Sequence, residues 1–166
     1  MATAILGATH ASLDEHDGRG RTFYLIASAH AARMMVPKRS GLIVNISYWA
    51  ARKYIGNAIY GAAKAATDKL SADMAHELLA HGIAVVSLYP GLVRTEAVME
   101  AAKAGWLDIS NSESPEFVGR VIAAFAEHSS ALNRSGQTLV AAALAQELGI
   151  KDGNERQPEP LTLETA

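Results

Sequence analysis

Two short and nearly continuous apolar runs stand out in the hydropathy pattern of this 166-residue chain. They are Leu-Ile-Val-Asn-Ile at 42–46 and Ile-Ala-Val-Val-Ser-Leu-Tyr at 83–89, and glycine, proline or polar residues bound each of them. Runs of this length without alternation are typical of strands buried on both faces of a parallel sheet. We therefore predict two buried strands here, and a third, shorter strand at 138–140.

Helical periodicity marks the segments before and between the two long runs. Apolar or small residues recur every three to four positions from Thr22 to about Val36. A longer, alanine-rich helix is predicted from 58 to 80, because His81 and then Gly82 follow it and glycine is the usual residue after a helix end. Each helix is long enough to connect two parallel strands.

Three shorter helices are expected: one within 93–105 after a loop, one from Pro115 to about His128, and one that ends at Gly149. Ser114 is the predicted N-cap of the second, with Pro115 at the first helical position, where proline is favoured. Strands that alternate with helices in this way indicate an open parallel α/β sheet with crossover helices.

The ends of the chain show weaker patterns. Residues 1–21 are expected to form an irregular N-terminal segment with at most a short strand at 2–6, and 22–150 to form the sheet domain. Asp-Gly-Arg-Gly at 17–20 is predicted to be a turn, since it lacks a preceding strong strand and the third glycine of a dinucleotide-binding fingerprint. Polar and proline-bearing residues predict an irregular tail at 151–166.

Composition and charge exclude several classes of function. A hydrophobic content of 49%, a charged content of 19% and a net charge of −2 describe an ordinary globular domain. The chain has no basic stripe for nucleic acid and no apolar run long enough for a membrane span. Cysteine is absent, and the six histidines lack the spacing of metal ligands, so we expect no metal. The N-terminus resembles no signal peptide, so a cytoplasmic location is expected.

A tyrosine and a lysine four residues apart open the alanine-rich helix. Tyr60 and Lys64 project from one helix face. A phenol titrates at about pH 10 in water, which is too high for proton transfer at neutral pH. A cation one turn away favours the phenolate and lowers this pKa. The pair is a candidate acid–base centre, although the spacing alone also fits chance neighbours on a solvated face.

Other candidate residues follow the two predicted strands directly. Ser47 follows the first, and Pro90-Gly91 follows the second. In open parallel sheets, ligands bind beyond the carboxyl ends of the strands. We therefore expect Tyr60, Lys64, Ser47 and the Pro90-Gly91 turn to converge on one crevice.

Three sequence blocks occur in an order typical of one enzyme family. They are Gly-Leu-Ile-Val-Asn-Ile-Ser at 41–47, Tyr-Gly-Ala-Ala-Lys at 60–64 and Leu-Tyr-Pro-Gly-Leu-Val-Arg-Thr at 88–95. Residues 24–148 resemble the C-terminal half of a short-chain dehydrogenase/reductase (SDR). Ala-Arg-Met-Met-Val-Pro at 32–37 is similar to the subgroup near dehydrogenase/reductase member 1. The resemblance implies a partial Rossmann-type fold over 22–150, with the N-terminal dinucleotide-binding half missing.

The resemblance also implies a reaction, namely hydride transfer between NAD or NADP and a carbonyl or alcohol carbon. Tyr60 would exchange a proton with the substrate oxygen, and Lys64 would lower the pKa of Tyr60 and bind the nicotinamide ribose. A serine would hold the substrate oxygen, and Ser47 is the candidate. The residues implied to contact the cofactor are Tyr60, Lys64, Pro90, Gly91, Val93 through its backbone, and Thr95 through its hydroxyl.

This sequence departs from the family pattern in three places. A glycine-rich first turn and the residue that chooses between NAD and NADP have no counterpart, so the cofactor site is expected to be truncated. The family serine falls on Ser47 when counted back from Tyr60 (60 − 47 = 13) and on Tyr48 when counted forward from Asn45. We favour Ser47; the alternative is that the serine role is lost. The family asparagine of the preceding helix also has no counterpart near 17–18.

Two functions from different classes are consistent with these features. The first is an oxidoreductase that acts on a small carbonyl or alcohol substrate. The alternative is an inactive α/β fragment that serves as a dimerisation or interaction module. In the family, the helices corresponding to 22–36 and 58–80 form a contact between subunits, so the resemblance implies a homo-oligomer through these helices. An unrelated α/β fold would require all three sequence blocks to coincide by chance.

Overall fold

The computed structural model of the chain describes residues 19–166. Three parallel strands form its main sheet in the order β1–β2–β5. Their bounds are Gly41–Ile46 for β1, Ile83–Tyr89 for β2 and Thr138–Val140 for β5. The three strands predicted from the sequence are confirmed, as is the open parallel α/β sheet.

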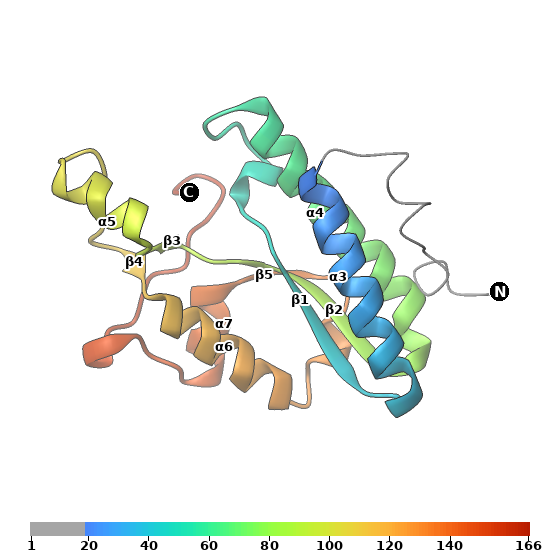
Figure 1. Ribbon diagram of the computed structural model, residues 1–166. Coiled ribbons are helices and arrows are strands. Elements are labelled where there is room, and N and C mark those ends of the chain that lie inside the picture. Colours follow the sequence, from blue (N-terminus) through green and yellow to red (C-terminus); the bar gives the residue numbers. More distant parts are fainter. Residues whose placement is uncertain (1–18) are drawn as a thin grey trace.

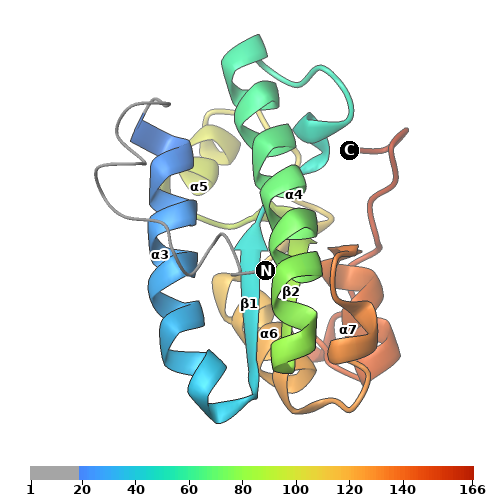
Figure 2. The same cartoon turned by 90° about the vertical axis from the view of Figure 1, so that its right-hand side faces the viewer.

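Helices cover both faces of this sheet, as Figures 1 and 2 show. The helices α3 and α4 lie on one face, and α6 and α7 on the other. The helix bounds are Arg19–Met35 for α3, Ala58–Leu78 for α4, Glu96–Lys103 for α5, Pro115–Glu127 for α6 and Ala141–Leu148 for α7. Short 3-10 turns are η1 Val36–Lys38, η2 Trp49–Ala51, η3 Leu79–His81, η4 Leu132–Arg134 and η5 Gly153–Glu155. Within residues 19–166, no helix is both long and apolar enough to cross a membrane.

The first described helix begins earlier than the sequence predicts. Helix α3 begins at Arg19, so Arg19 and Gly20 are helical and the turn predicted for them is wrong. Glycine destabilises a helix interior, but the first turn has backbone N–H groups without intrahelical partners and tolerates it better. The strand predicted at 2–6 and the turn positions 17–18 lie outside the described residues.

A second, two-stranded parallel sheet was not predicted. It pairs β3 (Leu92–Val93) with β4 (Ser112–Glu113). Segments of two residues carry no detectable periodicity, and Ser112-Glu113 is polar, so nothing in the pattern marks them as a buried strand. Both β4 residues are nevertheless buried, and they lie close to the turn that follows β2.

The burial patterns of the strands reflect their positions in the sheet. All seven residues of β2 are buried, because β2 lies between β1 and β5 and helices cover both of its faces. In β1, which has one neighbour within the described residues, Ile43 and Asn45 are buried toward α3 and α4. Leu42, Val44 and Ile46 lie on the other face and remain partly exposed.

Two residues with a left-handed backbone conformation, Arg39 and Gly82, approach each other at the amino-terminal ends of β1 and β2. Gly82 has a φ of +72°, and a Cβ there would lie 2.4 Å from the Arg39 carbonyl oxygen, so only glycine fits. Arg39 has a φ of 52°, and its guanidinium donates to the Ala80 carbonyl at 3.0 Å. These contacts hold the amino-terminal ends of β1 and β2 close together.

Candidate active site

Helix α4 carries both members of the candidate acid–base pair near its N-terminus. The Asn57 side chain accepts a hydrogen bond from the Tyr60 backbone N–H at 2.9 Å and so caps the helix. Lys64 Nζ lies 5.7 Å from the centroid of the Tyr60 ring, as expected for residues one helical turn apart. Tyr60 is 38% exposed, so it is open to a ligand on one side.

Lys64 connects α4 to the carboxyl end of β1. Its Nζ donates to the Ile46 carbonyl oxygen at 3.2 Å, and the Tyr24 hydroxyl from α3 donates to the same oxygen at 3.3 Å. Burial lowers the pKa of Lys64, and the carboxylate of Asp68 one turn further along α4 partly opposes this change. Sequence reasoning missed Tyr24, because its contact depends on how α3 packs against β1 and no motif marks it.

The pKa of Tyr60 is shifted upward, opposite to the effect that a neighbouring cation alone would have. Burial is the main cause, and the phenols of Tyr48 and Tyr24 add to it, because a second ionised phenol nearby would disfavour the phenolate. The ammonium of Lys64 lies against the ring and donates to a backbone carbonyl. At neutral pH Tyr60 is therefore a neutral phenol that can donate a proton.

Ser47 and Tyr48 follow β1 and point in different directions. Ser47 is 1% exposed, and its hydroxyl donates to the Lys64 carbonyl oxygen at 3.1 Å beneath α4. Tyr48 has an extended backbone, with φ −166° and ψ 165°, so its side chain projects away from that of Ser47. Tyr48 is half-buried, and burial together with the nearby Glu113 raises the pKa of its phenol.

The turn after β2 lies against a buried carboxyl group that sequence reasoning missed. Pro90 is buried, and the Gly91 backbone N–H hydrogen-bonds to the Glu113 side chain. A Cβ at Gly91 would lie 2.9 Å from Glu113 Oε1, so the glycine permits this close contact. Burial raises the pKa of Glu113 to about 7, and its Oε2 has no hydrogen-bond partner among the described residues.

The remaining predicted cofactor contacts lie in and after β3. Val93 pairs with Glu113 through the parallel β3–β4 ladder, so its backbone is fixed in place. Thr95 is exposed, and its Oγ1 accepts from the Val98 N–H at 3.4 Å as the N-cap of α5. Because the hydroxyl serves there only as an acceptor, its own proton is available for a ligand.

A clasp of Arg94, Ser112 and Asp152 closes the base of the segment that contains α5. The Arg94 guanidinium donates to the Ser112 carbonyl oxygen at 2.9 Å and to Asp152 Oδ2 at 2.8 Å. Asp152 also accepts from the backbone N–H of Ser114, the α6 N-cap, at 3.0 Å. Burial opposes ionisation of Asp152, but hydrogen bonds from Ser114, Gly153 and Arg94 outweigh it and hold the pKa of Asp152 well below its usual range.

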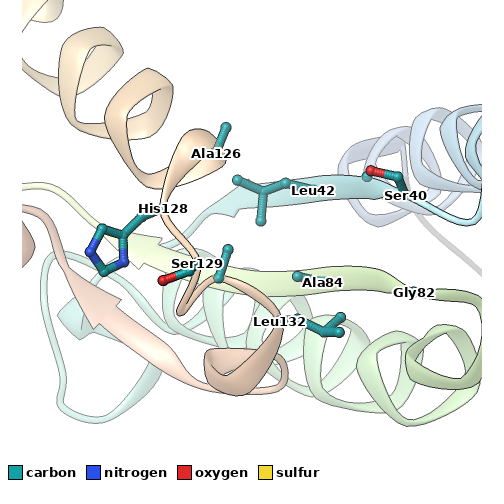
Figure 3. Close-up of a pocket in the computed structure, with 10 residues that line it drawn as sticks. Ser40, Leu42, Gly82, Ala84, Ala126, His128, Ser129 and Leu132 are labelled. Carbon is teal, nitrogen blue, oxygen red and sulfur yellow. The ribbon is translucent and has the colours of Figure 1, made fainter.

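A pocket of about 350 Å³ lies at the other end of the sheet (Figure 3). Ser40, Gly82 and Ala84 line it near the amino-terminal ends of β1 and β2, and His128 and Leu132 lie across from them. Ligands of open parallel sheets bind at the carboxyl ends of the strands, where Tyr60 and Lys64 lie. The chemistry of the side chains therefore places the candidate site away from this pocket.

The donors at the carboxyl end of the sheet fit one part of a nicotinamide dinucleotide. The Lys64 ammonium and the Thr95 hydroxyl suit ribose hydroxyls and a carboxamide, and the Gly91 turn lies four residues before Thr95 in the sequence. A pyrophosphate needs a glycine-rich turn into a helix N-terminus. Within residues 19–166, no strand runs through such a turn into a helix, so the fit is confined to the nicotinamide end.

Two comparisons at the sequence level match most of the chain. The family model described as short chain dehydrogenase matches residues 22–105. Dehydrogenase/reductase SDR family member 1 from Mus musculus is 39% identical over 168 residues, which cover 90% of this chain and 54% of the relative. The chain thus spans about half the length of the curated relatives it matches.

Solved structures of similar proteins support the same assignment. A short chain dehydrogenase/reductase family protein is 36% identical with a TM-score of 0.58, over 72% of this chain and 50% of that one. A 3-oxoacyl-[acyl-carrier protein] reductase with bound NAD from Brucella melitensis is 26% identical with a TM-score of 0.56, over 72% and 45%. By fold, by sequence blocks and by these similarities, the chain belongs to the short-chain dehydrogenase family.

Proposed function

We propose that this chain forms the substrate side of an oxidoreductase site that transfers a hydride between NAD or NADP and a small carbonyl or alcohol compound. The observation that carries the proposal is the position of Lys64. Its ammonium is held on the Ile46 carbonyl at the carboxyl end of β1, 5.7 Å from the Tyr60 ring centroid. Family membership and the NAD-bound relative support a nicotinamide cofactor. Nothing in the comparisons favours the alternative of an inactive interaction module.

When bound, the cofactor supplies the hydride at the substrate carbon. The proton is handled by Tyr60. Because burial raises its pKa, the phenol is protonated at neutral pH and donates its proton to the substrate oxygen. A carbonyl oxygen becomes far more basic than a phenolate once its carbon is reduced, so this transfer is favourable even from a phenol with a raised pKa. Alcohol oxidation runs the same proton transfer in reverse and requires the Tyr60 phenolate as the base.

Lys64 positions the reactants in this scheme. Its bond to Ile46 fixes the ammonium over the end of β1, and its remaining donors would be available to the hydroxyls of a nicotinamide ribose. The Gly91 turn, the Val93 backbone and the Thr95 hydroxyl would hold the nicotinamide end of the cofactor. Glu113 holds the turn through the Gly91 N–H.

Two measurements test the proposal. Purified chain is titrated with NADH and with NADPH, and a change in nicotinamide fluorescence is expected; titrations that stay flat up to millimolar cofactor refute cofactor binding by this chain. Tyr60→Phe is then assayed with NADPH and a carbonyl substrate, where loss of the proton donor is expected to lower kcat by about 100-fold or more. Cofactor binding should persist.

A matched control is Tyr54→Phe, because Tyr54 is exposed and its hydroxyl bonds to the Gly56 carbonyl at 2.8 Å. The control is expected to keep full turnover. If Tyr60→Phe turns over at the same rate as this control, Tyr60 is not the proton donor.

A further inference from the structure

The serine hydroxyl at the end of β1 is not placed to receive a substrate. Asn45 and Ser47 lie on the same side of the strand, two residues apart, and both bond to α4. The Asn45 amide donates to Ser71 Oγ at 2.9 Å, and the Ser47 hydroxyl donates to the Lys64 carbonyl at 3.1 Å. Ser47 is 1% exposed. Its hydroxyl therefore serves the packing of β1 against α4.

The next residue, Tyr48, presents a hydroxyl on the opposite side. Its extended backbone continues the alternation of β1, so the ring leaves the strand away from α4's buried face. The ring is half-buried at the carboxyl end of β1. Tyr48 lies close enough to Tyr60 to raise the pKa of the Tyr60 phenol, and close enough to Glu113 to be affected by that carboxylate. Tyr48 lies two residues beyond Ile46, whose carbonyl accepts from Lys64 Nζ, and this Nζ lies 5.7 Å from the Tyr60 ring centroid, so Tyr48 and the proton donor lie at the same end of the sheet.

A carbonyl oxygen that gains negative charge is best stabilised by two preorganised donors. Tyr60 supplies one. Because burial raises the pKa of Tyr48, its phenol keeps its proton at neutral pH and is a second neutral donor.

We propose that Tyr48, in place of Ser47, holds the substrate oxygen beside Tyr60. This assignment rests on the proposed oxidoreductase function. Loss of the Tyr48 hydroxyl is therefore expected to weaken binding of a carbonyl compound and to leave the cofactor contacts intact. Trp49, which follows Tyr48 and packs edge-to-face on Tyr89 with ring centroids 5.2 Å apart, provides a fluorescent reporter next to the ring.

The first test measures binding without cofactor. Wild-type protein, Tyr48→Phe, Ser47→Ala and the control Tyr54→Phe are titrated with 9,10-phenanthrenequinone, and tryptophan quenching is followed. Tyr48→Phe keeps the ring and loses one hydrogen bond, so its Kd is expected to rise about five- to tenfold, whereas Tyr54→Phe binds like wild type. Equal binding by Tyr48→Phe, a larger loss in Ser47→Ala, or no binding by wild type overturns the proposal.

The second test separates this proposal from the proposed function. The same variants are titrated with NADPH and assayed for reduction of the quinone. Tyr48→Phe is expected to bind NADPH like wild type and to lose at least tenfold in kcat/KM. If NADPH fails to bind wild type while the quinone result holds, the proposed function falls and the role of Tyr48 in binding stands. If NADPH binds and turnover is unaffected by Tyr48→Phe, the role of Tyr48 falls. Matching thermal midpoints confirm that each variant is folded.

Discussion

The replacement Glu113→Gln is expected to remove a pH dependence of stability that arises from one buried carboxyl group. Glu113 is 1% exposed, and burial raises its pKa from 4.5 to about 7. The Gly91 N–H and Arg94 lower this pKa, and Asp152 raises it further, but burial dominates. Between the unfolded and folded pKa values the unfolded chain is ionised while the folded chain keeps the proton. Stability therefore falls as pH rises from about 4.5 to about 7, and then levels off.

The size of the effect follows from the difference between the two pKa values. A difference of about 2.5 corresponds to about 3 kcal/mol, most of which is expressed between pH 5 and pH 8. A protonated carboxyl and a carboxamide each place one neutral donor group at the unpartnered Oε2 position. The two chains are therefore expected to be of similar stability at pH 5, and Glu113→Gln is expected to gain about 2 to 3 kcal/mol over wild type by pH 8.

Urea denaturation at pH 5, 6, 7 and 8 measures this difference directly. Taking the gap between Glu113→Gln and wild type cancels contributions from the histidines, which both chains share. Glu116→Gln is the matched control, because it makes the same chemical change at an exposed position on α6. A gap that stays constant within about 0.5 kcal/mol from pH 5 to pH 8 would refute the reasoning, since the carboxyl would then titrate alike in both states.

Three further predictions follow from other contacts. Asp152→Ala is expected to lower the free energy of unfolding by about 3 to 5 kcal/mol, because Arg94 and Ser114 lose a buried charged acceptor; a loss below about 1 kcal/mol in urea denaturation contradicts this. Asn57→Ala removes the N-cap of α4 and should cost about 1 kcal/mol, while Asn57→Ser should restore most of it. The exposed faces of α3 and α4 are expected to form a homodimer. Met34→Glu, at a residue 69% exposed on α3, should then shift light-scattering mass toward the monomer, whereas Leu163→Glu in the tail should not.

The sequence predicted those elements whose signals are local. The strands β1 and β2 were recognisable as continuous apolar runs, and Ser114 with Pro115 marked the start of α6. The small residues at the start of α4 permit close packing, since a Cβ at Gly61 would lie 3.1 Å from the Ala50 carbonyl oxygen. Such features depend on neighbours in the chain, which the sequence displays.

Features that depend on distant contacts were missed or left open. The charge of Glu113 and its polar neighbours indicate a surface residue, yet the β3–β4 pairing buries it under the Gly91 turn. Spacing counts could not decide between Ser47 and Tyr48, because one residue of register reverses the side-chain direction on a strand. The pKa direction of Tyr60 likewise depends on burial and on Tyr24, which approaches from another helix.

The clasp of Arg94, Ser112 and Asp152 has a consequence for how this protein can diverge. It holds together the residues at both ends of the segment 95–111, which includes α5. The ends of this segment therefore stay close to each other. Changing the length of a loop whose ends are already held together costs little free energy. Substitutions or insertions between the two ends therefore need not disturb the sheet or the Tyr60–Lys64 pair.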